Sequence, residues 1–156
     1  RKELYESHGI TASFIQDNES KSVRGVVRGL HYQLVPYAQS KLVRVVSGRV
    51  YDVVVDLRRG SPAFGQWLGI ILDDIDKKQL FIPKGFAHGF SVLSKTAVFS
   101  YKCDNVYNRG YERAVNLNDP DLGIDWMLGD EKPVVSEKDL LAPPLKKAEM
   151  NFYYNL

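Results

Sequence analysis

The chain has 156 residues, of which 44% are apolar and 26% charged, and its formal net charge is +2. This is the composition of an ordinary globular protein, and we expect a single domain over residues 1–156. Basic and acidic residues are interspersed and no apolar run is long enough to cross a bilayer, so we expect neither a nucleic-acid nor a membrane partner. A single cysteine, Cys103, excludes an internal disulfide and fits a reducing cytoplasm, where we expect the protein to act.

The N-terminal segment is polar and contains little that predicts a core. Arg1–Ser7 favours a short helix that ends at Gly9, and Ala12–Asp17 is typical of a short strand. Three polar side chains follow one another in Gln16–Asn18, and the charged stretch Glu19–Arg24 predicts a turn.

Val26–Gln33 (VVRGLHYQ) is the stretch around which we expect the chain to be organised. Its β-branched start predicts a strand, in which His31 and Gln33 share one face and Arg28 points to the other. Gly29 indicates a β-bulge that would turn Arg28 toward His31. These residues alone favour equally a pocket with a cation beside a titratable base and a strand end with a solvated arginine and a hydrogen-bonded histidine.

Two strands are expected next, over Lys41–Val46 and Arg49–Leu57, joined as a hairpin through Ser47–Gly48. Asp52 and Asp56 share one face of the second strand with valines. An aspartate directed into an apolar core needs a partner, so the sequence predicts one for Asp52.

The rest of the chain continues with short strands. They are expected at Gly65–Leu72, Gln79–Ile82, Ser91–Lys95 and Ala97–Cys103. The glycine-framed motif Phe86–Phe90 places His88 near a strand end, and we expect His31 and His88 to meet at the mouth of a barrel. The C-terminal part is expected to hold a loop at Asn116–Trp126, a short helix capped within Ser136–Asp139, and a tail, Leu141–Leu156, packed on the surface or on a partner. This pattern predicts an all-β sandwich or barrel.

The histidines do not have the spacing of a metal site. The residue two after His31 is Gln33, and His88 is followed by Gly89 and a phenylalanine, while His8 belongs to the polar N-terminal segment and is expected at the surface. The chain has neither a G-x-S-x-G turn nor a phosphate-binding glycine loop. General acid–base chemistry is the class that remains.

His31 is the candidate base, and it would need an orienting carboxylate. Tyr101 is a candidate acid, although a core tyrosine with a satisfied hydroxyl is the more common use of such a residue. Lys41 could stabilise an oxyanion or lie at the surface, and Cys103 is expected to be a small buried residue.

Seven motifs occur together in a recognisable order. They are Arg28–Gln33, Lys41–Arg44, Asp52–Asp56, Ser61–Trp67, Ile82–Phe90, Tyr101–Lys102 and Asn118–Pro120. From about Gln16 to Asp139 the chain resembles the RmlC-type dTDP-4-dehydrorhamnose 3,5-epimerases, a cupin-like family of sugar-nucleotide epimerases. The resemblance implies an all-β, cupin-like jelly-roll barrel with short peripheral helices, a homodimer, and a reaction without metal or cofactor.

The implied substrate is dTDP-4-dehydro-6-deoxy-D-glucose, inverted at C3 and C5 to give dTDP-4-dehydro-L-rhamnose. By resemblance His31 is the base, Asp139 its carboxylate partner, Tyr101 the acid on the opposite face and Lys41 the cation that stabilises the enolate. The positions implied to contact substrate and nucleotide are Arg28, Gln16, Asp17, Asn18, Gln33, His88, Glu112, Lys138 and Tyr107.

The chain departs from the family pattern in places. The family's N-terminal strand with the pattern Asp-x-Arg-Gly-x-Phe-x-Glu is expected to be missing, and Val106 occupies a position where the family often has tyrosine, so Tyr107 is the expected substitute. Two alternatives remain open: an epimerase of a dTDP-4-keto-6-deoxysugar that inverts C3 or C5 alone, and a non-catalytic cupin that binds a nucleotide sugar.

Overall fold

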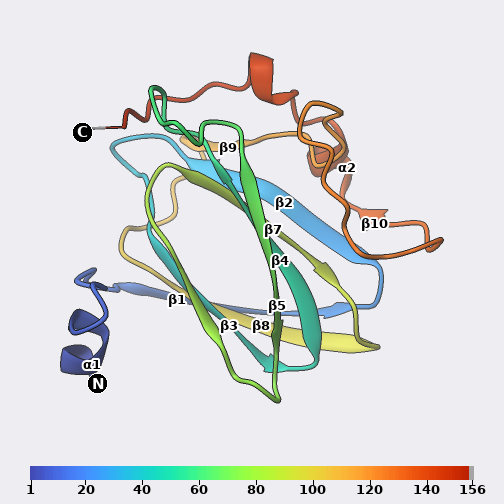
Figure 1. Ribbon diagram of the computed structural model, residues 1–156, viewed down its shortest axis with the longest axis horizontal. Helices are drawn as coiled ribbons and strands as arrows, with labels where there is room; N and C mark the ends of the chain where they lie inside the picture. Colours follow the sequence, from blue (N-terminus) through green and yellow to red (C-terminus); the bar gives the residue numbers. More distant parts are fainter. Residues whose placement is uncertain (155–156) are drawn as a thin grey trace.

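In the computed structural model, which describes residues 1–154, ten short strands form two packed sheets (Figure 1). The strands are β1 (Gln16–Val23), β2 (Val26–Gln33), β3 (Lys41–Ser47), β4 (Arg49–Asp56), β5 (Trp67–Asp73), β6 (Gln79–Ile82), β7 (Phe86–Val92), β8 (Thr96–Cys103), β9 (Glu112–Ala114) and β10 (Val134–Val135). The four-stranded sheet has the order β1–β8–β3–β6. The six-stranded sheet has the order β10–β2–β7–β4–β5, with β9 also paired to β2.

The pairings are antiparallel except for the short contact between β10 and β2. Helical turns are brief and peripheral: α1 (Lys2–Glu6), α2 (Glu137–Leu140) and the 3-10 turn η1 (Leu145–Lys147). Within residues 1–154 no helix has the length and apolar character to cross a membrane. Two sheets packed face to face with short peripheral helices confirm the predicted cupin-like jelly roll.

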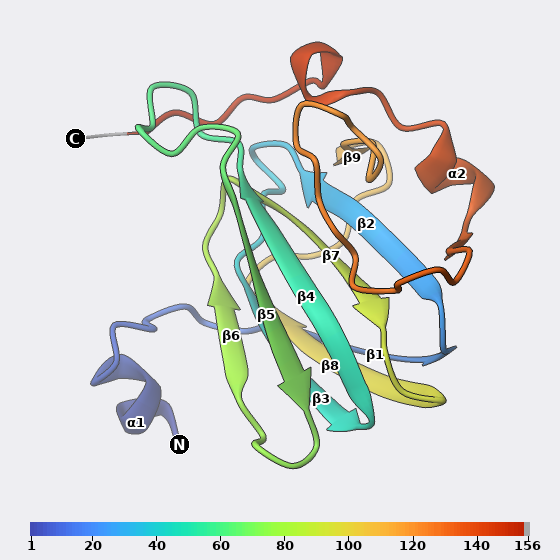
Figure 2. The ribbon, with the colours of Figure 1, turned by 45° about the vertical axis from the view of Figure 1, so that its right-hand side comes forward.

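Two apolar cores lie on the two faces of the six-stranded sheet. Between the sheets, Val45 and Val54 are buried, and Phe99 of β8 stacks on Phe90 of β7 with ring centroids 4.3 Å apart. On the other face, Val53 and other residues of the sheet pack under the segment that follows β9. Figure 2 shows this orange and red segment around β2. Successive residues of β4 face opposite sides of the sheet, so that Val54 belongs to the inner core between the sheets and Val53 to the outer core.

The C-terminal tail packs against this outer core of the same chain. The sequence had left open whether the tail packs on the protein's own surface or on a partner. Met150 and Phe152 are only 8% and 6% exposed, and both belong to the outer core. The bridge between Arg59 and Tyr153 attaches the tail to the loop after β4. The last two residues of the expected tail lie outside the described residues.

The strand Val26–Gln33 is confirmed with the predicted bounds and with a bulge at Gly29. Its register against β7 shifts between Arg28 and His31, and Gly29 adopts a φ of +138°. A Cβ at Gly29 would lie 2.6 Å from the Cα of Gly89 in β7. Only glycine therefore allows this approach of the two strands, and the irregularity re-aims the side chains that precede His31.

The turn predicted at Glu19–Arg24 is wrong, because β1 continues to Val23 and pairs with β8 along its whole length. Its charged side chains alternate outward while every second residue turns toward the sheet interior. Pairing with β8 outweighs the low strand propensity of these residues. The strand predicted at Ala12–Asp17 begins only at Gln16, and the one predicted at Gly65–Leu72 begins at Trp67.

The hairpin predicted at Ser47–Gly48 is also wrong. The strands on either side of it, β3 and β4, belong to different sheets. Gly48, with a φ of +88°, turns the chain from one sheet to the other, and a Cβ there would lie 2.2 Å from the carbonyl oxygen of Thr96. Ser47–Gly48 does form a sharp turn, as its composition predicts. Such a turn is compatible with a corner between two sheets as well as with a hairpin.

The motif Phe86–Phe90 forms the first five residues of β7, so that His88 is the third residue of the strand. The strand predicted at Ser91–Lys95 is divided, since its first two residues complete β7 and the rest form the turn before β8. β7 is the strand between β2 and β4, and His31 and His88 are direct cross-strand partners. The expected meeting of the two histidines is correct, but it occurs within the sheet, where two flanking strands satisfy the backbone of β7.

Candidate active site

A pocket opens between the two sheets, where polar side chains replace the apolar ones of the inner core. It consists of two adjoining cavities of about 240 and 530 Å³. Four residues line both cavities: Asn18 of β1, His31 of β2, Lys41 of β3 and Tyr101 of β8. The pocket thus brings together a base, a cation and a phenol from three different strands, each of them predicted as a site residue.

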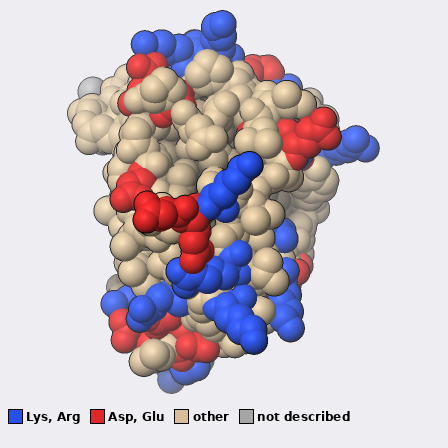
Figure 3. Space-filling view, turned by 90° about the vertical axis from the view of Figure 1, so that its right-hand side faces the viewer, with Lys and Arg blue, Asp and Glu red and all other residues tan. Residues whose placement is uncertain are grey.

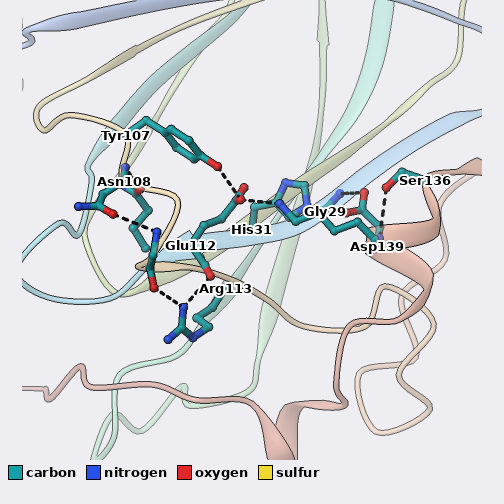
Figure 4. Close-up of polar contacts among 11 residues, drawn as sticks. Gly29, His31, Tyr107, Asn108, Glu112, Arg113, Ser136 and Asp139 are labelled. Atoms are coloured by element: carbon teal, nitrogen blue, oxygen red, sulfur yellow. Dashed lines mark hydrogen bonds and ion pairs between the residues drawn. The ribbon is translucent and has the colours of Figure 1, made fainter.

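His31 is held by a carboxylate from a segment far away in the sequence. Its Nε2 lies 2.7 Å from Oδ1 of Asp139, which is the third residue of α2 (Figure 4). Ser136 caps α2, as predicted, by accepting a hydrogen bond from the Asp139 backbone N–H, and the Gly29 N–H donates to Oδ2 of Asp139 at 3.4 Å. The bulge in β2 therefore also helps to orient the carboxylate.

The charge state of Asp139 follows from these contacts. Burial raises the pKa of Asp139. The hydrogen bond and charge of His31, together with hydrogen bonds to Gly29 and Ser136, outweigh this effect and leave the pKa below its ordinary value. Asp139 is therefore ionised at neutral pH, and it can stabilise a protonated His31. This is the arrangement that a histidine needs in order to act as a base.

A second histidine–carboxylate pair lies beside the first. His88 Nε2 is 2.9 Å from Oδ2 and 3.0 Å from Oδ1 of Asp52, a residue of the adjacent strand β4. Asp52 is fully buried, and the His88 ring stacks on Phe99 with 6.0 Å between centroids. The sequence predicted that Asp52 needs a partner, and His88 is that partner. Asp56, the other aspartate of this strand face, is paired with Arg58 at 2.7 Å.

Lys41 and Tyr101 form the opposite wall of the pocket. The ammonium of Lys41 lies 5.8 Å from the centroid of the Tyr101 ring, and Cys103 is the cross-strand partner of Lys41. Burial lowers the pKa of Lys41, and the negative groups around it oppose this shift only in part. Burial raises the pKa of Tyr101, so that its phenol is protonated at neutral pH and can donate a proton.

Cys103 is fully buried, as expected, and its pKa is raised to about 11, chiefly by burial. It is therefore a neutral thiol beside Lys41. Arg28 is exposed and lines the larger cavity together with His31, which confirms that the bulge brings the two to one pocket. Its guanidinium has the geometry to bind a phosphate group in bidentate fashion.

The three polar residues at the start of β1 lie on opposite faces of the strand. Gln16 and Asn18 turn inward and line the smaller cavity. Asp17 points outward, where its carboxylate pairs with Lys102 at 2.7 Å, and it reaches only the rim of the larger cavity. Strand alternation separates residues that the sequence had grouped.

At the mouth of the smaller cavity, three further predicted residues form one cluster. Glu112 of β9 accepts hydrogen bonds from the Tyr107 hydroxyl at 2.8 Å and from the ammonium of Lys138 in α2. Burial raises the pKa of Glu112, but these two donors outweigh it and hold the pKa below its ordinary value. In Figure 4 the His31 ring lies between Glu112 and Asp139.

Gln33, the remaining predicted residue, is buried and lines the smaller cavity. Its side-chain amide is engaged by backbone groups. Sequence reasoning missed Gln39 and Phe99, which also line the cavities. It noted Asp52 without placing it beside the site. An inward position in an alternating strand was the signal for Phe99, whereas nothing local marks Gln39.

Charged side chains of both signs are intermingled on the face of the molecule that carries α2 and β10 (Figure 3). Among residues 1–154, no group of three or more histidine, cysteine, aspartate or glutamate side chains is arranged to hold a metal ion. His8, as expected, is exposed. The pocket between the sheets is the place where His31, Lys41 and Tyr101 converge.

The fold and the pocket define a class: a cupin-like jelly roll whose inner cavity carries a histidine–carboxylate pair opposite a tyrosine and a lysine. The family model for dTDP-4-dehydrorhamnose 3,5-epimerase matches residues 1–147. The chain belongs to the dTDP-4-dehydrorhamnose 3,5-epimerase family.

Curated relatives agree with this assignment. The chain is 51% identical over 140 residues to dTDP-4-dehydrorhamnose 3,5-epimerase of Shigella flexneri, covering 90% of this chain and 76% of the relative. It is 56% identical over 134 residues to the enzyme of Pseudomonas aeruginosa, covering 86% of this chain and 73% of the relative.

Solved structures share the fold. The RmlC epimerase of Legionella pneumophila, crystallised in complex with dTDP-4-keto-L-rhamnose, superposes with a TM-score of 0.89 at 51% identity and covers 94% of this chain and 78% of its own. ChmJ, a 3'-monoepimerase of Streptomyces bikiniensis in complex with dTDP-quinovose, has a TM-score of 0.86 at 36% identity, covering 94% and 74%. The family fold thus includes enzymes that differ in how many carbons they invert.

Proposed function

We propose that this protein is an epimerase that converts dTDP-4-dehydro-6-deoxy-D-glucose into dTDP-4-dehydro-L-rhamnose. The observation that carries the proposal is the convergence of His31, Lys41 and Tyr101 on one pocket, in a chain of the epimerase family. Tests must show inversion at both C3 and C5, because a relative such as ChmJ is named as inverting one carbon only.

The reaction begins with the acidity that the C4 ketone gives to the protons on C3 and C5. His31 removes one proton, and the resulting imidazolium is stabilised by the ionised Asp139 at 2.7 Å. The electron pair of the broken C–H bond moves onto the C4 oxygen as an enolate, which the Lys41 ammonium stabilises in a sheltered site. Tyr101 then donates its proton to the same carbon from the opposite face, and solvent restores both groups.

The diphosphate and nucleotide are assigned to the charged and polar residues around this centre. Arg28 and Lys138 supply cations for the diphosphate. His88, held by Asp52, contacts the sugar from the sheet side. The other assigned contacts are Gln16, Asp17, Asn18, Tyr107 and Glu112. The larger cavity, which Arg28 and His88 share with the four central residues, has the volume for a sugar and its phosphates.

Three further properties are part of the proposal and follow from the family resemblance. The reaction needs neither a metal ion nor a cofactor, since a fixed lysine can meet the enolate charge. The protein is a homodimer, and it acts in the cytoplasm, where nucleotide sugars are made. Light scattering of the purified protein tests the dimer, and full activity after dialysis against a chelator tests metal independence.

The experiment that tests the activity is NMR of the product formed from the dTDP-ketosugar in heavy water. We expect deuterium at both C3 and C5 and a product with the L-configuration. Deuterium and inversion at one carbon only would favour a single-site epimerase, and no exchange at either would favour a non-catalytic nucleotide-sugar-binding protein. In Tyr101→Phe we expect exchange to survive better than inversion, and equal loss of both would count against its role as acid.

A further inference from the structure

The hydrogen bonds of the Gln33 side chain all go to the backbone of two loops, the loop between β2 and β3 and the loop after β8. Its Nε2 donates to the carbonyl oxygens of Tyr37 at 2.8 Å and Val106 at 3.1 Å, and its Oε1 accepts from the N–H of Asn108 at 2.6 Å. The residue is 5% exposed. Both amide protons and the amide oxygen therefore already have partners inside the protein, which leaves little hydrogen-bonding capacity for a substrate.

Two of these bonds go to the loop after β8, to the residues on either side of Tyr107. Val106 and Asn108 are its immediate neighbours, and the N–H of Tyr107 itself donates to Oε1 of Gln16 at 2.9 Å. Three consecutive residues of this loop are thus held by two glutamine side chains from β2 and β1. Tyr107 itself is 52% exposed, and its hydroxyl donates a hydrogen bond to Glu112 at the mouth of the smaller cavity.

Further side-chain amides join the same two loops. Gln39 donates to the carbonyl oxygen of Asn105 at 2.8 Å, and Asn105 donates back to Pro36 at 3.0 Å. The backbone N–H of Ser40 bonds to the carboxylate of Asp104 at 2.7 Å. The loop between β2 and β3 and the loop after β8 are therefore connected mainly through side chains, with Gln33 at the end nearest Tyr107.

We propose that Gln33 is a positioning residue that acts on ligand binding through Tyr107 and does not itself contact the ligand. Figure 4 shows the Tyr107 ring directed toward Glu112 at the rim of the site. A tyrosine on an otherwise free loop would have to be ordered each time a ligand binds, whereas Gln33 holds the loop in place beforehand. The inference rests on the proposed function for the identity of the ligand, a thymidine diphosphate sugar.

The test compares Gln33→Leu, Tyr107→Ala and their double variant, with dTDP as the probe. We expect Gln33→Leu to weaken dTDP binding about tenfold by calorimetry, because the loop must then be ordered on binding. Amide hydrogen exchange at Val106 to Asn108 should accelerate in the same variant. In the Tyr107→Ala background, Gln33→Leu should change dTDP affinity less than about twofold, since both changes act on one contact.

Asn151 provides a matched control. Its side-chain amide also makes two backbone bonds to this region, from Val35 N–H to Oδ1 at 3.0 Å and from Nδ2 to the Val35 carbonyl oxygen at 3.1 Å, but at the surface away from the pocket. We expect Asn151→Leu to leave dTDP affinity unchanged. Gln33→Met, which keeps the length of the side chain and removes the three hydrogen bonds without burying a charge, serves as the second variant if Gln33→Leu does not fold.

Additive losses in the double variant, or unchanged hydrogen exchange at residues 106–108, would overturn the proposal and assign Gln33 to direct ligand contact or to no role. A wild-type protein that binds dTDP but does not convert the ketosugar would contradict the proposed function alone. A wild-type protein that does not bind dTDP would contradict both.

Discussion

His31 and His88 are cross-strand neighbours in the six-stranded sheet, and each places Nε2 within 3.0 Å of an aspartate. The His31 side chain is 29% exposed, and its partner comes from α2, 108 residues further along the chain. The His88 side chain is 8% exposed, and Asp52, on the adjacent strand, is fully buried. The difference between the pairs is therefore one of solvent access and of how the carboxylate is anchored.

The two pairs differ in what they contribute to stability and to proton transfer, because one is buried within a sheet and the other is completed by a surface helix. Removing one member of a buried pair leaves an uncompensated charge in the interior, so the cost falls on stability. A partly exposed pair contributes less to stability, but its histidine can take a proton from a ligand and return it to solvent. We therefore expect substitutions at His31 to affect turnover most, and substitutions at His88, although it also contacts the sugar, to affect folding most.

The largest effect is expected from His31→Ala. Without the base, deuterium incorporation at C3 and C5 should fall by about 10²–10⁴-fold, the usual contribution of a positioned general base. NMR of the ketosugar in heavy water measures it. His31→Asn, which keeps a donor for Asp139, should lose activity equally while the unfolding midpoint stays close to that of the wild type. Near-normal exchange in His31→Ala would contradict its role as base.

His88→Ala should act on stability, lowering the free energy of unfolding by about 3–5 kcal/mol because Asp52 remains buried without its partner. Urea unfolding followed by circular dichroism gives this value. Asp52→Asn combined with His88→Ala removes the charge as well, and should recover part of the loss. If His88→Ala unfolds within about 1 kcal/mol of the wild type, the distinction between the two pairs is wrong.

Asp139→Asn should reduce exchange by about 10²-fold, since His31 loses the carboxylate that stabilises its protonated form. The variant also tests the lowered pKa of Asp139. A carboxyl whose pKa is lower in the folded state stabilises the protein above its ordinary pKa, and this stabilisation is lost as pH falls through the lowered value. Unfolding free energy measured across the acidic range should therefore depend less on pH in Asp139→Asn. Identical pH dependence in both proteins would exclude this contribution.

Lys41→Arg should have the smallest effect, one confined to alkaline pH. The pKa of Lys41 lies below its ordinary value of 10.5, so the cation is lost as pH rises through that lowered pKa. Arginine stays charged, and its variant should extend the alkaline limb of kcat to higher pH than in the wild type. Lys95→Arg, an exposed control, should leave the limb unchanged. If the alkaline limb of kcat does not move in Lys41→Arg, the titration of another group causes it.

Several features of the site could be read from short segments because their causes are local. The β-branched start of Val26–Gln33 and the glycine within it predicted a bulged strand, and Ser136 predicted the start of α2. Asp52, set among valines, required a partner wherever it came to lie. The resemblance of ordered motifs to an epimerase family predicted the family, which the match over residues 1–147 confirms, and it also supplied the candidate site residues.

Other features depended on contacts between distant segments. Ser47–Gly48 has the composition of a hairpin but turns the chain from one sheet to the other, and β1 extends through charged residues because β8 pairs with it. The pairing of His88 with Asp52 likewise followed from the strand order. No local pattern distinguishes these outcomes, because the energy that decides them comes from burial and pairing between segments.

The sequence by itself determined that the chain is a β-rich fold of the epimerase family, with His31 in a bulged strand, since strand periodicity and glycine conformation act over a few residues. Only the tertiary structure decided that Asp139 reaches His31 from a helix 108 residues away while its neighbour His88 pairs with the buried Asp52. It also showed that Gln33 is engaged by two loops, because hydrogen-bond partners are set by which segments pack together.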